Sequence, residues 1–320
     1  MERHAEIFQS EGSSNGRCKV TPPQSRRNSS TKKKVINAAD GLGARPLGPS
    51  TLEKLAYVER YGQAFMAAMA PKRAQGKWDK LVYFDLLCGP GICIDRDTLQ
   101  EYDGSPLRAL KIRPAFDHLF FSDSGQKNID TLKKRIPAED RNRVTCRKGD
   151  CNSLIKEFLA DVTDKTLGLA FLDPEGFEVQ FKTLQLLATK RIDVIYLFPS
   201  GIGIARNLGK FVHESKTPME GFWGEDWRDL PAAKLAAGKK LTPAEVESFD
   251  RPWVKTFRQK VATLGFTHQD EDAPILLTET DTLMYHLLFF SKDKAGLKIW
   301  RGIKEIDPNK QRNLPFERGL

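Results

Sequence analysis

Residues 81–91 read Leu-Val-Tyr-Phe-Asp-Leu-Leu-Cys-Gly-Pro-Gly, and they include side chains well suited to bind a ligand. The apolar, aromatic-rich run predicts a buried strand. The strand leads to Asp85 and then to a turn, Gly89-Pro90-Gly91. Glycines let a backbone approach a ligand closely, and a carboxylate binds polar groups on that ligand. The pattern predicts a pocket for an adenosine-containing cofactor, with a plain tight turn as the alternative.

Acidic residues also end three further predicted strands. Asp123, Asp150 and Asp173 each come after an apolar segment, as Asp85 does. In open α/β sheets the ligand binds at the carboxyl ends of the strands, so four acids could meet at one cleft. We expect Asp123 to accept hydrogen bonds from ribose hydroxyls and Asp150 to reach an adenine amino group. Taken singly, each acid is also compatible with a turn or a helix cap.

The segment Asp173-Pro174-Glu175-Gly176-Phe177 is a second candidate for chemistry. It resembles the Asp/Asn-Pro-Pro-aromatic loop of amino-group methyltransferases that act on bases. Asp173 and the carbonyl of Pro174 could accept hydrogen bonds from an exocyclic amine, while Phe177 stacks on the flipped base. Glu175 and Gly176 depart from the usual pattern, and a structural turn at the strand end is the alternative.

Strand and helix signals alternate along the chain, which predicts parallel strands joined by crossover helices. We expect strands at residues 81–87, 118–123, 144–146, 167–172 and 193–198, with helices at 52–69, from 105, and at 125–136, 152–161 and 181–189. The polar segment 92–103 is predicted to be a lid or a substrate contact. Residues 206–262 are predicted to form a helical insertion or cap, with Trp223, Trp227 and Trp253 packing it onto the core. Residues 275–279 and 285–290 are further strand candidates.

The composition is that of a globular protein with a basic balance. The chain has 320 residues and a formal net charge of +9, which favours acidic partners such as DNA or RNA. Residues 1–50 are polar and basic, and we expect a disordered tail there, with the folded domain spanning residues 51–320. The sequence contains no apolar run long enough to span a membrane, so we expect no membrane association. A cytoplasmic location is expected, because five cysteines is an odd, low count that does not suggest a disulfide framework.

The cysteines and histidines are not expected to bind a metal. Cys88 and Cys93 are five positions apart, as are Cys146 and Cys151. Zinc pairs usually have shorter spacings, so we interpret these four as reduced cysteines near a pocket floor. His118 and His286 lie in apolar strands and are predicted to be core residues with satisfied hydrogen bonds.

Several segments together resemble the three-Cys-motif partner protein family: residues 83–91, 103–107, 171–174, 285–292 and 296–300. The resemblance implies a class I S-adenosylmethionine-dependent methyltransferase fold and a separate radical-SAM-like partner protein that carries three cysteines. It further implies that Asp85, Gly89 and Gly91 hold the methionine end of the cofactor, with Pro90 in the same turn. It implies Asp123 with its neighbour Ser124 at the ribose, Asp150 with its neighbour Cys151 at the adenine, and Asp173 with Pro174 at the methyl acceptor.

We therefore expect a Rossmann-like α/β domain with a mostly parallel twisted sheet, flanking helices and a helical insertion. The hypothesis is that it transfers a methyl group from S-adenosylmethionine to an amino group on a nucleic-acid base. Two alternatives stay open: a methyltransferase of small molecules or protein, and a non-catalytic scaffold with a cofactor fold that docks its partner.

Overall fold

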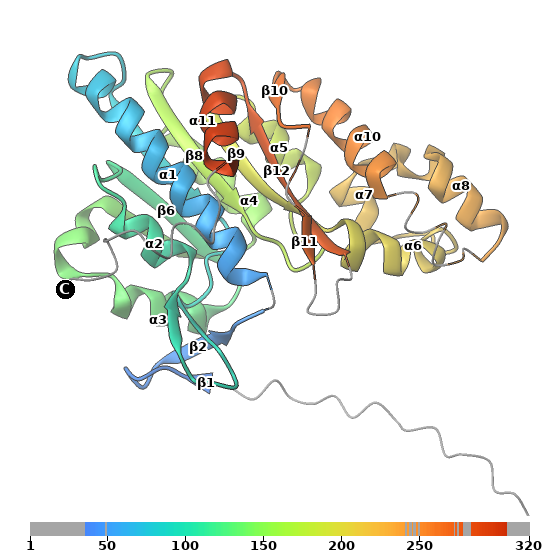
Figure 1. Cartoon of the computed structure of the whole chain (residues 1–320), viewed down its shortest axis with the longest axis horizontal. Coiled ribbons are helices and arrows are strands. Elements are labelled where there is room, and N and C mark those ends of the chain that lie inside the picture. The colour runs from blue at the N-terminus through green and yellow to red at the C-terminus, as the bar shows by residue number, and fades with distance from the viewer. Residues whose placement is uncertain are drawn as a thin grey trace, which may run out of the picture. The chain divides into compact units, whose positions relative to one another are not determined.

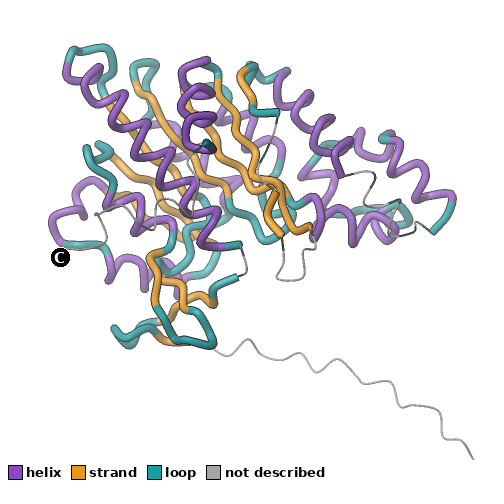
Figure 2. Tube along the Cα trace, viewed as in Figure 1, coloured by secondary structure: helices purple, strands orange, loops and turns teal. Residues whose placement is uncertain are grey.

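A computed structural model describes residues 36–48, 50–240, 242, 245, 248, 250–271, 273, 275–277 and 283–305. Figures 1 and 2 show strands at the centre and helices around them. The strands are β1 Ile36–Asn37, β2 Gly43–Pro46, β3 Lys80–Asp85, β4 Ile92–Ile94, β5 Glu101–Asp103, β6 His118–Asp123, β7 Val144–Lys148, β8 Thr166–Leu172, β9 Arg191–Phe198, β10 His268–Gln269, β11 Ile275–Leu277 and β12 Leu283–Ser291.

The helices are α1 Thr51–Ala74, α2 Ser105–Lys111, α3 Gln126–Arg135, α4 Cys151–Ala160, α5 Phe181–Leu187, α6 Arg206–Phe211, α7 Pro218–Phe222, α8 Pro231–Gly238, α10 Asp250–Ala262 and α11 Lys294–Lys304. The 3-10 helices η1 Ala138–Arg143 and η3 Glu225–Asp229 and the π-helix η2 Ser200–Ala205 complete the set. Among the described residues, no helix is both long enough and apolar enough to cross a membrane.

The main sheet has the strand order β10-β12-β9-β8-β3-β6-β7, and β11 also pairs with β12. Strands β7, β6, β3, β8 and β9 are all parallel to one another. Strand β12 runs antiparallel to β9. A parallel sheet that opens on both sides of its first strand and ends in an antiparallel strand is the class I methyltransferase arrangement of the Rossmann-like fold. The predicted fold class is confirmed.

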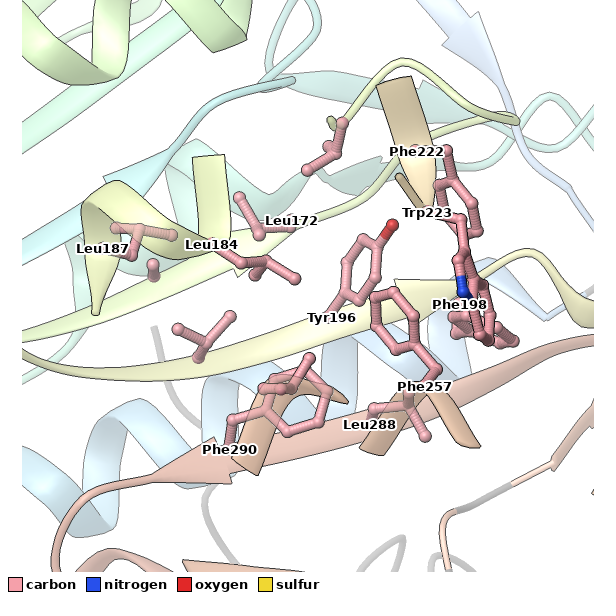
Figure 3. Packing of buried hydrophobic residues seen from close by; sticks show 14 of the residues in the cluster. Leu172, Leu184, Leu187, Tyr196, Phe198, Phe222, Trp223, Phe257, Leu288 and Phe290 are labelled. Carbon is pink, nitrogen blue, oxygen red and sulfur yellow. The ribbon is translucent and has the colours of Figure 1, made fainter. Parts of the chain in front are cut away.

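Alternating side chains of each central strand pack on opposite faces of this sheet, as the period of two requires. In β9, Val194, Tyr196 and Phe198 belong to one cluster of buried residues, whereas Ile195 and Leu197 belong to the other. Helices α1, α2, α3 and α11 contribute to the cluster that contains Ile195. Helices α4, α5, α6, α7, α8 and α10 contribute to the cluster of Tyr196, part of which is drawn in Figure 3. Burial on both faces explains why these strands are apolar throughout.

The predicted cap between β9 and β10 is helical, and its tryptophans pack against the core as expected. Trp223, Trp227 and Trp253 are all buried. Phe257 of α10 lies 4.7 Å from Phe198 of β9, centroid to centroid, and these rings join cap and sheet (Figure 3). The buried tryptophans therefore pack the cap onto the core.

The sequence analysis missed a second, smaller sheet with the order β1-β2-β4-β5. Strand β2 pairs in parallel with β4, and β4 forms a hairpin with β5. Segment 92–103 thus forms a structured hairpin, and its role as a lid or a substrate contact stays a prediction. The folded part also begins earlier than residue 51, because residues 36–46 supply two strands of this sheet. Residues 1–35 of the tail that was predicted at residues 1–50 lie outside the described residues.

Two helix ends differ from the prediction for local reasons. Helix α1 continues past Pro71 to Ala74, and the carbonyl of Pro71 accepts the N–H of Gln75 at 3.1 Å, as in a regular helix. Helix α2 has Gly104, not Ser105, as its N-cap residue. Ser105 is already helical, and its hydroxyl is a hydrogen-bond partner of Asp85 in the site described below.

Candidate functional site

The two glycines of the turn after β3, Gly89 and Gly91, have different surroundings. Gly89 has φ +63° and Gly91 has φ +95°, a region that L side chains rarely adopt. A Cβ on Gly91 would lie 3.1 Å from Leu132 and 3.3 Å from Leu107, so this glycine permits close packing. A Cβ on Gly89 would meet Arg45 Nη1 at 3.8 Å as its nearest atom. Gly89 is therefore the position at which the backbone can face a ligand.

Asp85 is a fully buried carboxyl at the carboxyl end of β3. Its Oδ1 accepts the N–H of Leu87 at 3.4 Å, and the hydroxyl of Ser105 is a further partner. Its Oδ2 has no hydrogen-bond partner among the described residues. Burial raises the pKa of Asp85 to about 7, and the negative charges of Asp173 and Asp123 add to that rise. An unpartnered buried oxygen is costly, so it marks a place where a cationic or hydrogen-donating ligand group would be stabilised.

Asp123 ends β6 and organises the loops around it. Its Oδ2 accepts the N–H of Gly89 at 3.0 Å, and its Oδ1 accepts the N–H of Gly125 at 2.7 Å and the Asn128 amide at 3.0 Å. Its neighbour Ser124 is exposed at the same turn. Asp123 thus holds the glycine turn in place and lies next to Asp85, as the sequence predicted.

Asp150 follows β7 at the same edge of the sheet, but its carboxylate bonds to the start of α4. The N–H of Gly149 donates to the carbonyl of Asp123 at 3.0 Å, which places the end of β7 beside the end of β6. The carboxylate itself is exposed and accepts hydrogen bonds from Asn152 at 2.8 Å and Ser153 at 3.0 Å at the start of α4. Cys151 is buried, with Sγ 3.7 Å from the carbonyl of Glu178. Asp150 therefore begins the helix, and an adenine contact stays a prediction.

Asp173 follows β8, which is hydrogen-bonded to β3, so its carboxylate comes to the same sheet edge. Lys54 of α1 forms an ion pair with Asp173 Oδ1 at 2.7 Å, and both side chains are 16 % exposed. Pro174 is buried beside it. The structure thus brings Asp85, Asp123 and Asp173 together, and it adds a cation that sequence reasoning did not assign.

A second cation at this edge was also missed. Arg45 lies on β2, where it is the register partner of Cys93 in β4. Its Nη2 forms an ion pair with Glu175 of the loop after β8. The pKa of Arg45 is raised: the charges of Glu175 and Asp173 outweigh the desolvation, which acts in the opposite direction. No spacing rule connects residue 45 to residue 175, because only the pairing of β2 with β4 brings them together.

Phe177, the predicted base-stacking residue, packs against other aromatic rings of this chain. It packs edge-on against Phe222 at 5.0 Å and against Phe211 at 5.6 Å, centroid to centroid. Its side chain is partly buried against the cluster that Figure 3 shows. These contacts attach the loop after β8 to the cap, so Phe177 has a structural task whether or not it also meets a substrate.

Arg135 at the end of α3 connects the glycine turn to the N-terminal strands. Its guanidinium donates to the carbonyl of Pro90 at 2.8 Å and to that of Gly43 at 2.9 Å. It also pairs with the carboxylate of Asp40 at 2.8 and 2.9 Å. The Arg135 side chain is only 5 % exposed and its bonds to the two carbonyls are partly buried, so these bonds fix the turn relative to β2.

The histidines are satisfied as predicted. His118 Nε2 lies 2.8 Å from Thr145 Oγ1, and His286 Nδ1 lies 2.8 Å from Ser200 Oγ. Burial raises the pKa of Cys146 to about 11 and that of Cys151 to about 12, so both are neutral thiols near pH 7. Within the described part of the chain, no group of three or more His, Cys, Asp or Glu side chains has a metal-binding arrangement.

Neither a protein-family model nor a curated protein matches the chain. Solved structures resemble it at low identity. A Legionella pneumophila protein of the DUF519 family has 13% identity and a TM-score of 0.44 over 78% of this chain and 91% of its own. Trm1 from Pyrococcus horikoshii, solved with S-adenosyl-L-methionine, has 12% identity and a TM-score of 0.39 over 78% of this chain and 57% of its own. An O-methyltransferase from Bacillus cereus, solved with SAH, has 11% identity and a TM-score of 0.39 over 77% of this chain and 92% of its own.

Proposed function

We propose that this chain is an S-adenosylmethionine-dependent methyltransferase whose acceptor is an amino group on a nucleic-acid base. The observation that carries the proposal is the buried Asp85 carboxyl, with an unpartnered Oδ2, beside a glycine whose Cβ position is open. The donor set suits the cofactor. The ammonium of the methionine end could pair with Asp85, and Asp123 could accept a hydrogen bond from a ribose hydroxyl.

When bound, the cofactor supplies an electrophilic methyl group on a sulfonium. The chain's own residues have to orient an amine toward it and keep water away, since methyl transfer depends mainly on alignment. Asp173 would accept a hydrogen bond from the amine through Oδ2, because Oδ1 is held by Lys54. That ion pair fixes the orientation of the carboxylate, so that Oδ2 can act as an acceptor. The carbonyl of Pro174 would accept the second amine proton.

Calorimetry with S-adenosylmethionine tests the cofactor, and transfer of a radiolabelled methyl group to DNA, RNA and protein pools tests the reaction. We expect Asp173→Ala to keep the cofactor affinity within about threefold and to reduce methyl transfer at least 100-fold, a loss typical of removing a positioning group. Asp226→Ala is the matched control, because Asp226 also pairs with a lysine but lies in the cap, away from the cofactor turn. Absence of cofactor binding would refute the proposal.

The methyl acceptor and the partner protein need separate tests. Methylation of a DNA or RNA pool supports the nucleic-acid acceptor, and methylation of protein alone would replace it. Binding of cofactor without transfer to any pool would favour the scaffold that docks a radical-SAM-like three-Cys-motif protein, which copurification with that partner would examine. Nucleic-acid binding should weaken steeply with salt. A deletion that tests the basic tail has to stop at Lys34, because the compact unit begins at Val35.

A further inference from the structure

The guanidinium of Arg45 lies above the glycine turn. Its Nη1 is the atom that faces Gly89, 3.8 Å from where a Cβ would stand, while Nη2 is paired with Glu175. Arg45 is therefore held between the cofactor turn and the loop after β8. Strand β2 carries it, and the Arg135 hydrogen bonds to Gly43 and Pro90 fix that strand against the turn.

A ligand that places an ammonium on Asp85 brings its α-carboxylate along, because both groups are attached to the same carbon atom. That carboxylate has to lie within a few ångströms of Asp85 and Gly89. Asp85, Asp123 and Asp173 all repel it, so its binding requires a cation. A guanidinium offers a planar pair of donors that matches a carboxylate. Lys54 is held by Asp173 at 2.7 Å, whereas Arg45 has Nη1 directed at the turn.

We propose that Arg45 recognises the α-carboxylate of the cofactor, and that this carboxylate replaces Glu175 as the partner of Arg45 when the cofactor binds. The proposal rests on the proposed function, since it assigns a residue to that same site. It makes Arg45 a specificity-determining residue, which selects S-adenosylmethionine over an analogue that lacks the carboxylate. It also couples cofactor binding to the loop of Asp173, because Glu175 leaves its partner.

The test compares dissociation constants for S-adenosylmethionine and for decarboxylated S-adenosylmethionine, measured by calorimetry. The variants are Arg45→Gln, which removes the charge, and Arg45→Lys, which keeps it without the planar donors. Arg73→Gln is the matched control, because Arg73 also pairs with a carboxylate, that of Asp117, but lies in the last turn of α1, near the start of β3 and away from the glycine turn. Circular dichroism and thermal unfolding of each variant establish that it is folded.

We expect Arg45→Gln to reduce the preference for S-adenosylmethionine over its decarboxylated analogue about 10- to 100-fold, the range for a hydrogen bond to a charged group. Arg45→Lys should retain part of the preference and Arg73→Gln all of it. If the folded Arg45→Gln protein discriminates between the two ligands as the wild type does, the inference is overturned. If the wild type binds neither ligand, the proposed function itself fails, and the two failures are thereby distinguished.

Discussion

Substitution of Asp85 by asparagine should make the protein more stable at high pH while destroying its cofactor site. In the unfolded chain Asp85 ionises near its ordinary pKa of 3.8, whereas burial keeps it protonated in the fold until about pH 7. The free energy of unfolding of the wild type therefore falls as the pH rises through this window. The contribution is fully present below pH 3.8 and is lost above about pH 7.

The size of the effect follows from the pKa difference. Each pKa unit corresponds to about 1.4 kcal/mol, so the displacement from 3.8 to about 7 amounts to about 4 kcal/mol over the whole range. Between pH 5 and pH 8 the advantage of Asp85→Asn over the wild type should grow by about 3 kcal/mol, since the group titrates through most of that interval. Asparagine is neutral at every pH, and it keeps an oxygen that can accept from Ser105.

Urea unfolding followed by tryptophan fluorescence, at pH steps from 5 to 8, measures this difference. Asp193→Asn is the control, because Asp193 is buried in β9 beside Tyr61, and burial raises its pKa to about 6. Its advantage should grow by only about 1 kcal/mol and stop near pH 6. Saturating S-adenosylmethionine should cancel the advantage of Asp85→Asn at pH 8 but leave that of Asp193→Asn. A stability difference between Asp85→Asn and wild type that stays constant from pH 5 to 8 would refute the reasoning.

The remaining predictions concern the cofactor turn and the cap. At pH 6.5, binding of S-adenosylmethionine should release up to about one proton, seen by calorimetry in buffers of different ionisation enthalpy, because the bound ammonium favours ionised Asp85; Asp85→Asn should abolish that release. Arg135→Gln should lower the free energy of unfolding by about 2 kcal/mol, as it removes the Arg135 donor from the carbonyls of the buried Pro90 and the half-buried Gly43; a loss below about 0.5 kcal/mol would contradict the role given to Arg135. Phe257→Ala should cost about 3–5 kcal/mol in urea unfolding, since the ring is fully buried between cap and sheet, and Phe257→Leu should cost less. An equal loss for both Phe257 variants would mean that the aromatic contacts of Phe257, and not the volume that its side chain fills, stabilise the fold.

The secondary structure of the main sheet was accessible from the sequence. Its parallel strands are buried on both faces, so residues such as Leu169 and Val194 lie in continuous apolar runs. Such runs distinguish these strands from segments that are exposed to solvent. The acids at the strand ends could be placed at one edge for the same reason, because parallel strands carry their carboxyl ends to one side. Asp85 and Asp123 met there as expected.

Only the tertiary structure decided what surrounds those acids. Strands β1, β2, β4 and β5 have between two and four residues each, too short for a periodic signal, and they are stabilised mainly by pairing with one another. That pairing brings Arg45 over Gly89, and the packing of α1 brings Lys54 to Asp173. These contacts join residues 44 and 119 positions apart, and contacts at such separations leave no mark on local spacing. The sequence by itself therefore determined the sheet and its acidic edge, whereas the fold alone determined which cations face that edge.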